Sequence, residues 1–442
     1  MTNQQHFNRG SIFRLVVGSV FLLNAGIFFF QALTKNLFPP LLLPLREAYL
    51  IDHAQAGLLV SLVFFGYALA RFPSGVIADQ IGCTKTVLLG SAAMAFSFIG
   101  VALSPNYPVL ALMTFILGVS SGIYVTAGYT LAVLIGSRER AATATAAFES
   151  FGIVAGIISP ALVTVFVVFL NWQLLFVASG LMLVIVTWLF YRNRRISARI
   201  ESEYAVQNGM SSSAHRKNAE SQLSSKAKLN RFMKDIKSSA VIFRDPLIRR
   251  FITWSTLVGG FGALSWTGIN SFIPTFLVEE QGYSYDMANQ MFIIVAAAGL
   301  AAKIGTGWLA DRFGNNLVMF FNLTFSVVLF ITLPLVTGLW PTLVVLALLG
   351  GTCLNTNTLI NSYVLRSMPP KYQGAGFGLF CTAYTVIYSL GPYLTGFLSG
   401  FVGLSRAIQL SSFGAVLAAA LILAANYFVP QHLVGKMVSD HQ

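Results

Sequence analysis

Three ionisable side chains lie inside long apolar stretches of this sequence. Arg71 stands eight residues before Asp79, and Lys303 stands eight residues before Asp311. Because a helix rises about 1.5 Å per residue, both cations would lie roughly 12 Å inward from those aspartates. Glu149 reaches a similar depth from its own basic flanking loop. Two cations and one carboxylate at the same level could hold an anion, pair with each other or carry a proton.

Uncharged polar side chains inside the apolar stretches, Tyr129 among them, could complete a binding site. Asn357 and Asn361 are four residues apart, so they share one helix face. Lys35 either points into a central cavity or extends toward the nearer membrane surface. A lone polar side chain in such a segment more commonly bonds to a neighbouring helix. The predicted substrate-binding residues are Arg71, Lys303, Lys35, Asn36, Tyr124, Trp266, Asn270, Asn357, Asn361 and Tyr384.

The sequence contains no arrangement typical of catalysis. It has no His-x-x-x-His metal pair, no nucleophile elbow and no phosphate-binding loop. Its three cysteines have neither disulfide nor metal-site spacing. We therefore expect a protein that is not an enzyme, needs no cofactor or metal, and uses no ATP to drive transport.

The elements that must position these residues are membrane-spanning helices. The 442 residues are 56% hydrophobic and only 10% charged, with a mean hydropathy of +0.72. A helix needs about 20 apolar residues to cross ~30 Å of hydrocarbon. The apolar runs are long and do not alternate every second residue, which excludes a transmembrane barrel. The sequence predicts an all-α protein with twelve spans at about 14–44, 55–79, 85–104, 108–135, 143–170, 173–191, 251–279, 287–310, 316–337, 341–366, 374–400 and 406–429.

The loops predict the orientation of the protein in the membrane. Lysine and arginine gather in alternate loops on the side of both termini, whereas the opposite loops carry acids such as Glu279. This pattern predicts cytoplasmic termini in a cytoplasmic (inner) membrane. Residues 192–250 hold 14 of the 28 basic and 5 of the 15 acidic residues. We expect a basic cytoplasmic linker that lies against anionic lipid and binds no nucleic acid, because aromatic residues do not interleave its charges.

The sequence repeats itself at a nearly constant offset. An offset of 232 residues relates Asp79 to Asp311 and Pro160 to Pro392. It also relates Arg71 to Lys303. Near the start of each half the offset becomes 234, as in the following pairs: Asn36 with Asn270, Pro40 with Pro274, and Asp52 with Asp286. Matches over separate helices predict two copies of one six-helix unit, at 1–191 and 251–442.

Twelve spans, a basic central linker and the pattern Gly-x-x-x-Asp-x-x-Gly after the second and eighth spans resemble the major facilitator superfamily of secondary transporters. The resemblance implies two six-helix bundles related by a pseudo-two-fold axis, with substrate bound between them. The repeated pattern would act as a gating motif, in which glycines admit a neighbouring helix and the aspartate holds one face closed. Its residues here are Gly75, Asp79, Gly82, Lys85, Gly307, Asp311, Arg312 and Gly314.

The same resemblance implies which intramembrane residues meet. Spans 5 and 8 contact each other in that family, so Glu149 would face Lys303. Spans 2 and 11 also meet, so Arg71 would face Tyr384. Lys303 is then either half of an ion pair or a ligand for an anionic substrate. Glu149, buried and able to lose its partner, would be the proton carrier.

The expected function is secondary active transport of a small solute, with a small organic or inorganic anion favoured and protons as the coupling ion, by a monomer. A neutral or zwitterionic solute stays open, because Glu149 could neutralise Lys303. A non-transporting receptor on the same fold is a further alternative. The paired cations also resemble those of nitrate/nitrite porters, but the Gly/Asn-rich signatures of those porters are missing. Lys303 also lacks the planar fork of an arginine.

Overall fold

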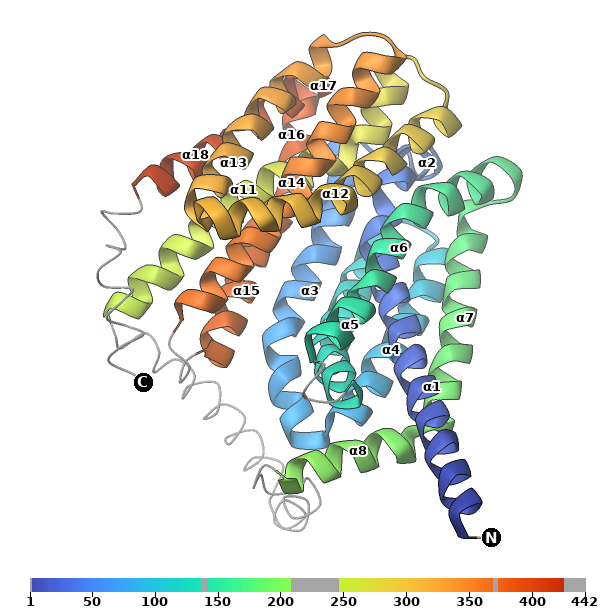
Figure 1. The fold of residues 1–442 in the computed structure, drawn as a ribbon. Coiled ribbons are helices and arrows are strands. Elements are labelled where there is room, and N and C mark those ends of the chain that lie inside the picture. Colours follow the sequence, from blue (N-terminus) through green and yellow to red (C-terminus); the bar gives the residue numbers. More distant parts are fainter. Residues whose placement is uncertain (1, 137–140, 208–245, 369–372, 425–442) are drawn as a thin grey trace, which may run out of the picture.

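The computed structural model describes residues 2–136, 141–207, 246–368 and 373–424, and all regular structure in these ranges is helical. The basic linker predicted at 192–250 lies partly outside the described residues. Its first part forms helix α8, Arg194–Gln207. Two bundles of helices stand side by side, one coloured blue to green and the other yellow to red in Figure 1.

The first bundle contains the first seven helices of the chain. A single segment is divided into α1 and α2, and five further long helices follow. The helices are α1 (Thr2–Asn36), α2 (Phe38–Tyr49), α3 (His53–Ile81), α4 (Cys83–Ala102), α5 (Tyr107–Ile135), α6 (Ala141–Phe169) and α7 (Trp172–Arg192).

The second bundle repeats this plan with breaks at other places. Its helices are α11 (Pro246–Glu279), α12 (Tyr285–Phe313), α13 (Asn315–Thr332) with the 3-10 turn η3 (Leu333–Leu335), α14 (Leu339–Ser367), α15 (Gln373–Ser389), α16 (Gly391–Val402), α17 (Leu404–Ser411) and α18 (Phe413–Leu423). The fold class predicted from the sequence, two six-helix bundles, is confirmed.

Ten segments of the described chain are long and apolar enough to cross a membrane. The other two predicted spans correspond to α11, which is 34 residues long, and to α15 with α16. The last two are individually short because the helix is interrupted at Leu390. The apolar segments therefore support an integral, multi-pass membrane protein.

Prolines explain where the long segments are interrupted. Pro39 and Pro40 lack the N–H groups that would bond to the carbonyls of Lys35 and Asn36, so the chain breaks at Leu37 between α1 and α2. Pro392 likewise frees the carbonyl of Tyr388, which accepts a hydrogen bond from Thr267 Oγ1 at 2.9 Å. Pro160 corresponds to Pro392, and Pro274 corresponds to Pro40. The helices that contain Pro160 and Pro274, α6 and α11, continue without a break. The two halves are therefore similar in plan but differ in the position of their breaks.

Close helix packing inside the halves follows the offset of 232 residues. A Cβ atom on Gly118 of α5 would lie 2.2 Å from the carbonyl oxygen of Val63 on α3. A Cβ atom on Gly350 of α14 would lie 2.0 Å from the carbonyl oxygen of Val295 on α12. The offset relates Gly118 to Gly350 and Val63 to Val295. The same glycine contact therefore packs the corresponding two helices in both halves.

The two halves touch at one end of the molecule and separate at the other. We call the end at which α3 and α12 stop the Asp79 face, and the opposite end, at which α11 stops, the Glu279 face. Near the Glu279 face, α3 packs directly on α16. A Cβ atom on Gly57 would lie 2.2 Å from the carbonyl oxygen of Pro392, and one on Gly396 would lie 2.2 Å from that of His53.

The helix α8 lies across the Asp79 face of the first half (Figure 1). Its Glu201 accepts hydrogen bonds from the backbone N–H groups of Cys83 (2.7 Å) and Thr84 (3.3 Å). These are the first residues of α4, whose N-terminal N–H groups otherwise lack helical partners. A carboxylate is favourable at a helix N-terminus, so Glu201 fixes α8 beside the loop that follows Asp79.

Candidate functional site

A cavity of about 790 Å³ lies between the two halves and is lined by residues toward the Asp79 face. The first half contributes side chains from α3, α5 and α6, and the second half contributes them from α12, α14 and α15. The cavity brings together four of the residues predicted to bind substrate or carry a proton: Arg71, Glu149, Lys303 and Asn361. The residues closing it include Val125, Thr126, Tyr129, Thr358, Phe377 and Cys381.

Arg71 brings an uncompensated positive charge to this cavity. Of the residues that the structure describes, no carboxylate lies within 4.0 Å of its guanidinium. Its own carbonyl accepts a hydrogen bond from Thr126 Oγ1 at 3.2 Å, which ties α3 to α5 at this level. Because α3 and α5 pack closely through Gly118, the guanidinium is held on a rigid pair of helices. A cation that faces a cavity inside the membrane without an acid beside it favours the entry of an anion.

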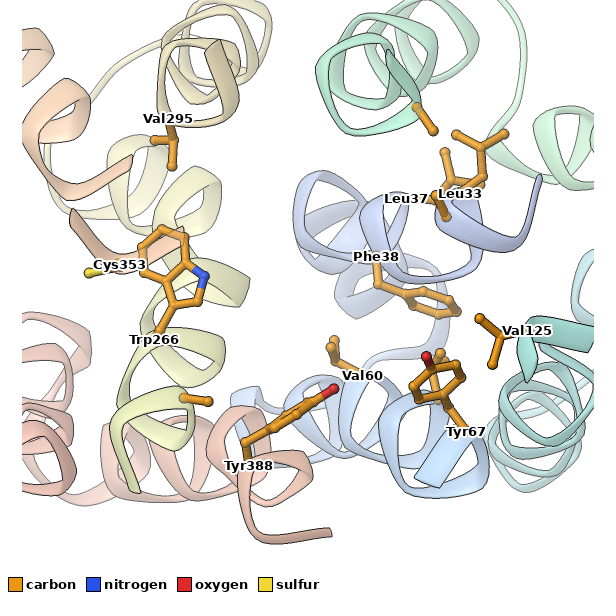
Figure 2. Packing of buried hydrophobic residues seen from close by; sticks show 14 of the residues in the cluster. Leu33, Leu37, Phe38, Val60, Tyr67, Val125, Trp266, Val295, Cys353 and Tyr388 are labelled. Carbon is orange, nitrogen blue, oxygen red and sulfur yellow. The ribbon is translucent and has the colours of Figure 1, made fainter. Parts of the chain in front are cut away.

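Tyrosines surround Arg71 and join it to the second half. Its guanidinium carbon lies 5.7 Å from the ring centroid of Tyr67. From α15, Tyr384 stacks on Phe380 at 4.9 Å and lies 5.3 Å from Tyr388, measured between ring centroids. Figure 2 shows Tyr388 reaching from α15 toward α3, where Val60 and Tyr67 lie. The hydroxyl dipoles and ring faces give the cation a polar surrounding that carries no fixed negative charge.

Lys35 shares the ring of Tyr67 with Arg71. Its Nζ lies 3.4 Å from the ring centroid, within the range of a cation–π contact. Lys35 is not among the residues that line the cavity. The side chain therefore points into the protein interior and does not extend to the membrane surface.

Lys303 and Glu149 lie opposite each other in the same cavity. The Lys303 Nζ is 3.8 Å from Glu149 Oε2, and Tyr129 donates a hydrogen bond to Glu149 Oε1 at 3.3 Å. The two side chains are 39% and 41% exposed. The expectation of a buried Glu149 is therefore wrong for this state, because the cavity opens beside it. A half-exposed ion pair stabilises a fold by only about 0–1 kcal/mol, so this pair contributes little to folding here.

Several predicted substrate ligands lie outside the cavity. Tyr124 is fully buried in the first half, where its hydroxyl donates to the carbonyl of Asn24 at 2.7 Å. Trp266 and Asn357 line a separate small cavity inside the second half, beside Cys353 (Figure 2). The remaining three are placed as follows: Asn36 donates to the carbonyl of Ala32 at 2.9 Å, Asn270 is half-buried in α11, and Tyr384 is buried in its stack.

The gating-motif residues lie at the ends of α3 and α12. Gly82 and Gly314 end these helices with φ of 93° and 88°, values that favour glycine. Asp311 accepts a hydrogen bond from Arg366 of α14 at 3.1 Å, whereas Arg312 stacks 5.4 Å from the ring centroid of Trp308. The rest lie as follows: Asp79 and Gly75 line the cavity, a Cβ atom on Gly307 would have no described atom from outside its own helix within 4 Å, and Lys85 lies in the first turn of α4.

Two residues beside Arg71 were missed by the sequence reasoning. Tyr67 contacts Arg71 and Cys381 lines the same cavity, yet neither stands out from the many aromatic and small residues of the spans. Tyr129 carries a clearer signal, because it is polar and shares the helix face of Val125, four residues earlier. Only the packing of α5 on α6 reveals that this face meets Glu149.

Two helical bundles enclose a polar cavity, and both bundles contribute residues to its lining. This arrangement is that of a membrane transporter whose substrate site lies between its halves. The sequence pattern of the Major Facilitator Superfamily matches residues 25–392 and 256–436. The chain belongs to this superfamily, whose members are transporters and not enzymes.

Three known proteins with similar sequences are named as transporters of organic acids. The gentisate transporter of Corynebacterium glutamicum is 22% identical over 80% of this chain and 75% of its own length. The cis,cis-muconate transport protein of Acinetobacter baylyi is 21% identical over 83% of this chain and 84% of its own. The niacin transporter NiaP of the same organism is 26% identical over 65% of each chain.

Solved structures share the fold. A bacterial homologue of the human lysosomal transporter Spinster, in an inward-facing and occupied conformation, has a TM-score of 0.69 at 15% identity and covers 96% of this chain and 97% of its own. A mutant of the nucleoside transporter NupG has a TM-score of 0.66 at 14% identity, with 93% of this chain and 99% of its own covered. At these identities the likeness concerns the fold alone.

Proposed function

We propose that the protein is a secondary transporter of a small organic carboxylate, which Arg71 binds in the central cavity. The observation that carries this proposal is the guanidinium of Arg71, which faces the cavity with no acid of the described chain beside it. A guanidinium offers two parallel N–H donors that match the two oxygens of a carboxylate. The organic-acid substrates named for three relatives agree with this choice.

The proposed transport cycle exchanges the two openings of the cavity. In the state described here the halves meet at the Glu279 face and separate at the Asp79 face. We propose that the Asp79 face is cytoplasmic, in an inner membrane, so that this state faces inward. Closing the Asp79 face would bring the ends of α3 and α12, with Asp79 and Asp311, toward the opposite half. The moving units would be residues 1–191 and 251–442, joined by the linker at 192–250.

Glu149 is the proposed proton carrier in this cycle. It lies in the substrate cavity, 3.8 Å from Lys303 on the opposite half, so relative motion of the halves changes its distance from a positive charge. A carboxylate binds a proton more readily when a nearby cation moves away. Proton binding and the movement of the halves would then be coupled, because the proton favours one state over the other.

A zwitterionic solute is the second candidate, because Arg71 and Glu149 present both charges to one cavity. An uptake screen in proteoliposomes separates the candidates. The full-length protein is offered radiolabelled aromatic and aliphatic carboxylates, amino acids and inorganic anions, with and without an inward proton gradient. We expect accumulation of one or more carboxylates that rises with the gradient. Uptake of amino acids in preference to carboxylates would favour the zwitterion, and uptake of none of these compounds would contradict the proposal.

A further inference from the structure

At the Glu279 face, three charged or titratable side chains from both halves converge outside the substrate cavity. Arg46 of α2 and His53 of α3 belong to the first half, and Glu279 ends α11 in the second half. Arg46 NH1 contacts Glu279 Oε1 directly. The three side chains are 20%, 20% and 28% exposed, so the cluster is largely shielded and still reachable by protons from solvent.

One nitrogen of His53 is shared by two partners with opposite requirements. His53 Nε2 lies 2.7 Å from Arg46 NH1 and 2.9 Å from Glu279 Oε2. A guanidinium only donates hydrogen bonds and an ionised carboxylate only accepts them. In one neutral tautomer Nε2 carries no hydrogen and accepts from Arg46, and in the other the Nε2–H donates to Glu279. In the imidazolium both ring nitrogens carry hydrogen, so Nε2 can only donate to Glu279 and opposes the N–H of Arg46.

Proton binding to His53 therefore leaves its Nε2 only the hydrogen bond that crosses to the second half. Neutral His53 bonds either to Arg46, which lies in the same half, or to Glu279, according to its tautomer. Protonated His53 forms a charge-assisted bond to Glu279, in addition to the contact between Arg46 and Glu279. The added bond holds the halves together at the Glu279 face. We infer that His53 is a proton-binding site of a gate at this face, and that proton binding favours the closed gate.

The surroundings of His53 leave this assignment clear. From α11, the ring of Phe272 lies 6.0 Å from the imidazole, and from α16 the contact is the backbone at Gly396. Neighbouring acids have other partners: Asp52 accepts from the backbone N–H of Gln55 at 2.7 Å, and Glu280 accepts from that of Ser405 at 3.0 Å. Of the described residues, Arg46 and Glu279 are thus the charged groups that contact the imidazole.

The charge of Glu279, at the loop end of α11, sets the lower limit of the pH range in which this gate responds. Burial alone would raise the pKa of Glu279, but the hydrogen bond with His53 and the charge of Arg46 outweigh burial and hold its pKa below the ordinary value. A carboxyl group with a lowered pKa keeps its contribution above its ordinary pKa and loses it only as the pH falls further. Glu279 consequently stays ionised at both pH 8 and pH 5.5, the two values that the test below compares.

This inference rests on the proposed function, since it treats the contact as a gate of an alternating-access cycle. Its consequence is a second point of proton coupling, distinct from Glu149. If the Glu279 face is the outer face, protons from an acidic external solution would bind His53 in the closed gate. The protein would then shift toward the inward-facing state. A proton can shift this equilibrium only because it bonds better in one state than in the other.

The test measures the closure of the gate without any substrate. Spin labels are attached to Leu103→Cys at the end of α4 and to Leu335→Cys in η3, in a full-length chain with Cys83, Cys353 and Cys381 replaced by alanine. Both positions are exposed and lie at the Glu279 end of opposite halves. Double electron–electron resonance in lipid nanodiscs then gives the ratio of short to long distances at pH 8 and pH 5.5.

We expect the ratio of closed to open gate to rise about tenfold or more on acidification, the size expected for one added charge-assisted hydrogen bond. His53→Gln and Glu279→Gln should each abolish this response, whereas His215→Gln, the matched control, should keep it. The absence of a pH response in the labelled chain that keeps His53 and Glu279, or a response that survives in His53→Gln, would overturn the inference. Because no substrate is used, the pH response of the gate can be interpreted even if the carboxylate screen fails. Successful uptake of a carboxylate does not by itself support the gate.

Discussion

Arg71 is the residue on which the proposed binding mode depends most directly. It faces the cavity without an acidic partner among the described residues, and its position is held by α3 and α5. Replacing it with lysine keeps the charge but removes the planar fork that matches a carboxylate. Loss of one charge-assisted hydrogen bond corresponds to about 1.5 kcal/mol, or roughly a tenfold weaker affinity.

We therefore predict that Arg71→Lys raises the apparent KM for the transported carboxylate about tenfold, and that Arg71→Ala raises it further. Initial rates of uptake into proteoliposomes measure this change. Arg199→Lys is the matched control, because Arg199 is exposed on α8 and pairs only with Glu203 among the described ion pairs. An unchanged KM in Arg71→Ala would remove Arg71 from the binding site.

Lys303 and Glu149 form the second residue-scale feature. Their half-exposed pair adds little to folding in this state, so its effect should appear in transport and not in thermal stability. Closing the Asp79 face would bury both groups, and a lone buried charge costs more than a missing pair. We predict that Glu149→Gln and Lys303→Met each impair transport more than the double variant does.

A double-mutant cycle on the uptake rate measures this coupling. Additive single losses would show that the two residues do not interact during transport. Uptake by Glu149→Gln is also compared with and without a proton gradient. If this variant still accumulates substrate in response to the gradient, Glu149 is not the proton carrier, even if the coupling to Lys303 is present.

At the scale of elements, the contact between α3 and α16 decides whether the Glu279 face can close. Gly57 and Gly396 let the two helices approach until a Cβ atom would collide with a backbone carbonyl at 2.2 Å. A backbone atom cannot move aside as a flexible side chain would. We predict that Gly57→Ala or Gly396→Ala separates these helices and shifts the protein away from the state described here.

Alkylation of Thr358→Cys at a fixed pH reports this shift, because Thr358 is exposed in the cavity that opens toward the Asp79 face. With Cys83, Cys353 and Cys381 replaced by alanine, the glycine variants should react several times more slowly than the parent. Gly400→Ala on the same helix α16 is the control, since a Cβ atom there would have no described neighbour within 4 Å outside its own helix. Equal rates in Gly396→Ala and Gly400→Ala would refute the role of this contact.

The sequence predicts more of the elements than of their contacts. Long apolar runs define the spans, and the depth of Arg71, Lys303 and Glu149 follows from helix rise alone. The break at Leu37 could be expected from Pro39 and Pro40. However, Pro160 and Pro392 look alike in sequence, and only the second interrupts a helix. Tertiary packing decides whether a proline bends a helix or ends it.

Site membership is harder to predict because it depends on neighbouring helices. Asn357 and Asn361 share a helix face, yet Asn361 lines the central cavity and Asn357 does not. Asn357 lies one turn farther from the Asp79 face, where residues of α11 and α13 cover α14. The cluster of Arg46, His53 and Glu279 has no signal in the sequence, since its members lie in different halves and belong to no repeated motif.

At the scale of the whole molecule, the proposed orientation makes a prediction of its own. In that orientation, which rests on the loops with excess lysine and arginine, the Asp79 face and the linker at 192–250 would lie in the cytoplasm. We predict that a cysteine introduced at Ser212 reacts with a membrane-impermeant reagent only after the membrane is permeabilised. Labelling of this cysteine in intact cells would reverse the orientation, and with it the assignment of the inward-facing state.

The central claim is that the cavity beside Arg71 binds the transported carboxylate. Protection of a cysteine introduced at Thr358 tests it most directly, because Thr358 lines the same cavity and is exposed, whereas the native Cys381 is buried. In a chain whose three native cysteines are replaced by alanine, the rate of alkylation of Thr358→Cys is measured with and without a saturating concentration of the carboxylate that the uptake screen identifies. We predict that the carboxylate slows alkylation several-fold in this protein and has no such effect when Arg71→Ala is added. Normal uptake with no protection of the cysteine at position 358, or equal protection with Arg71→Ala, would contradict the claim.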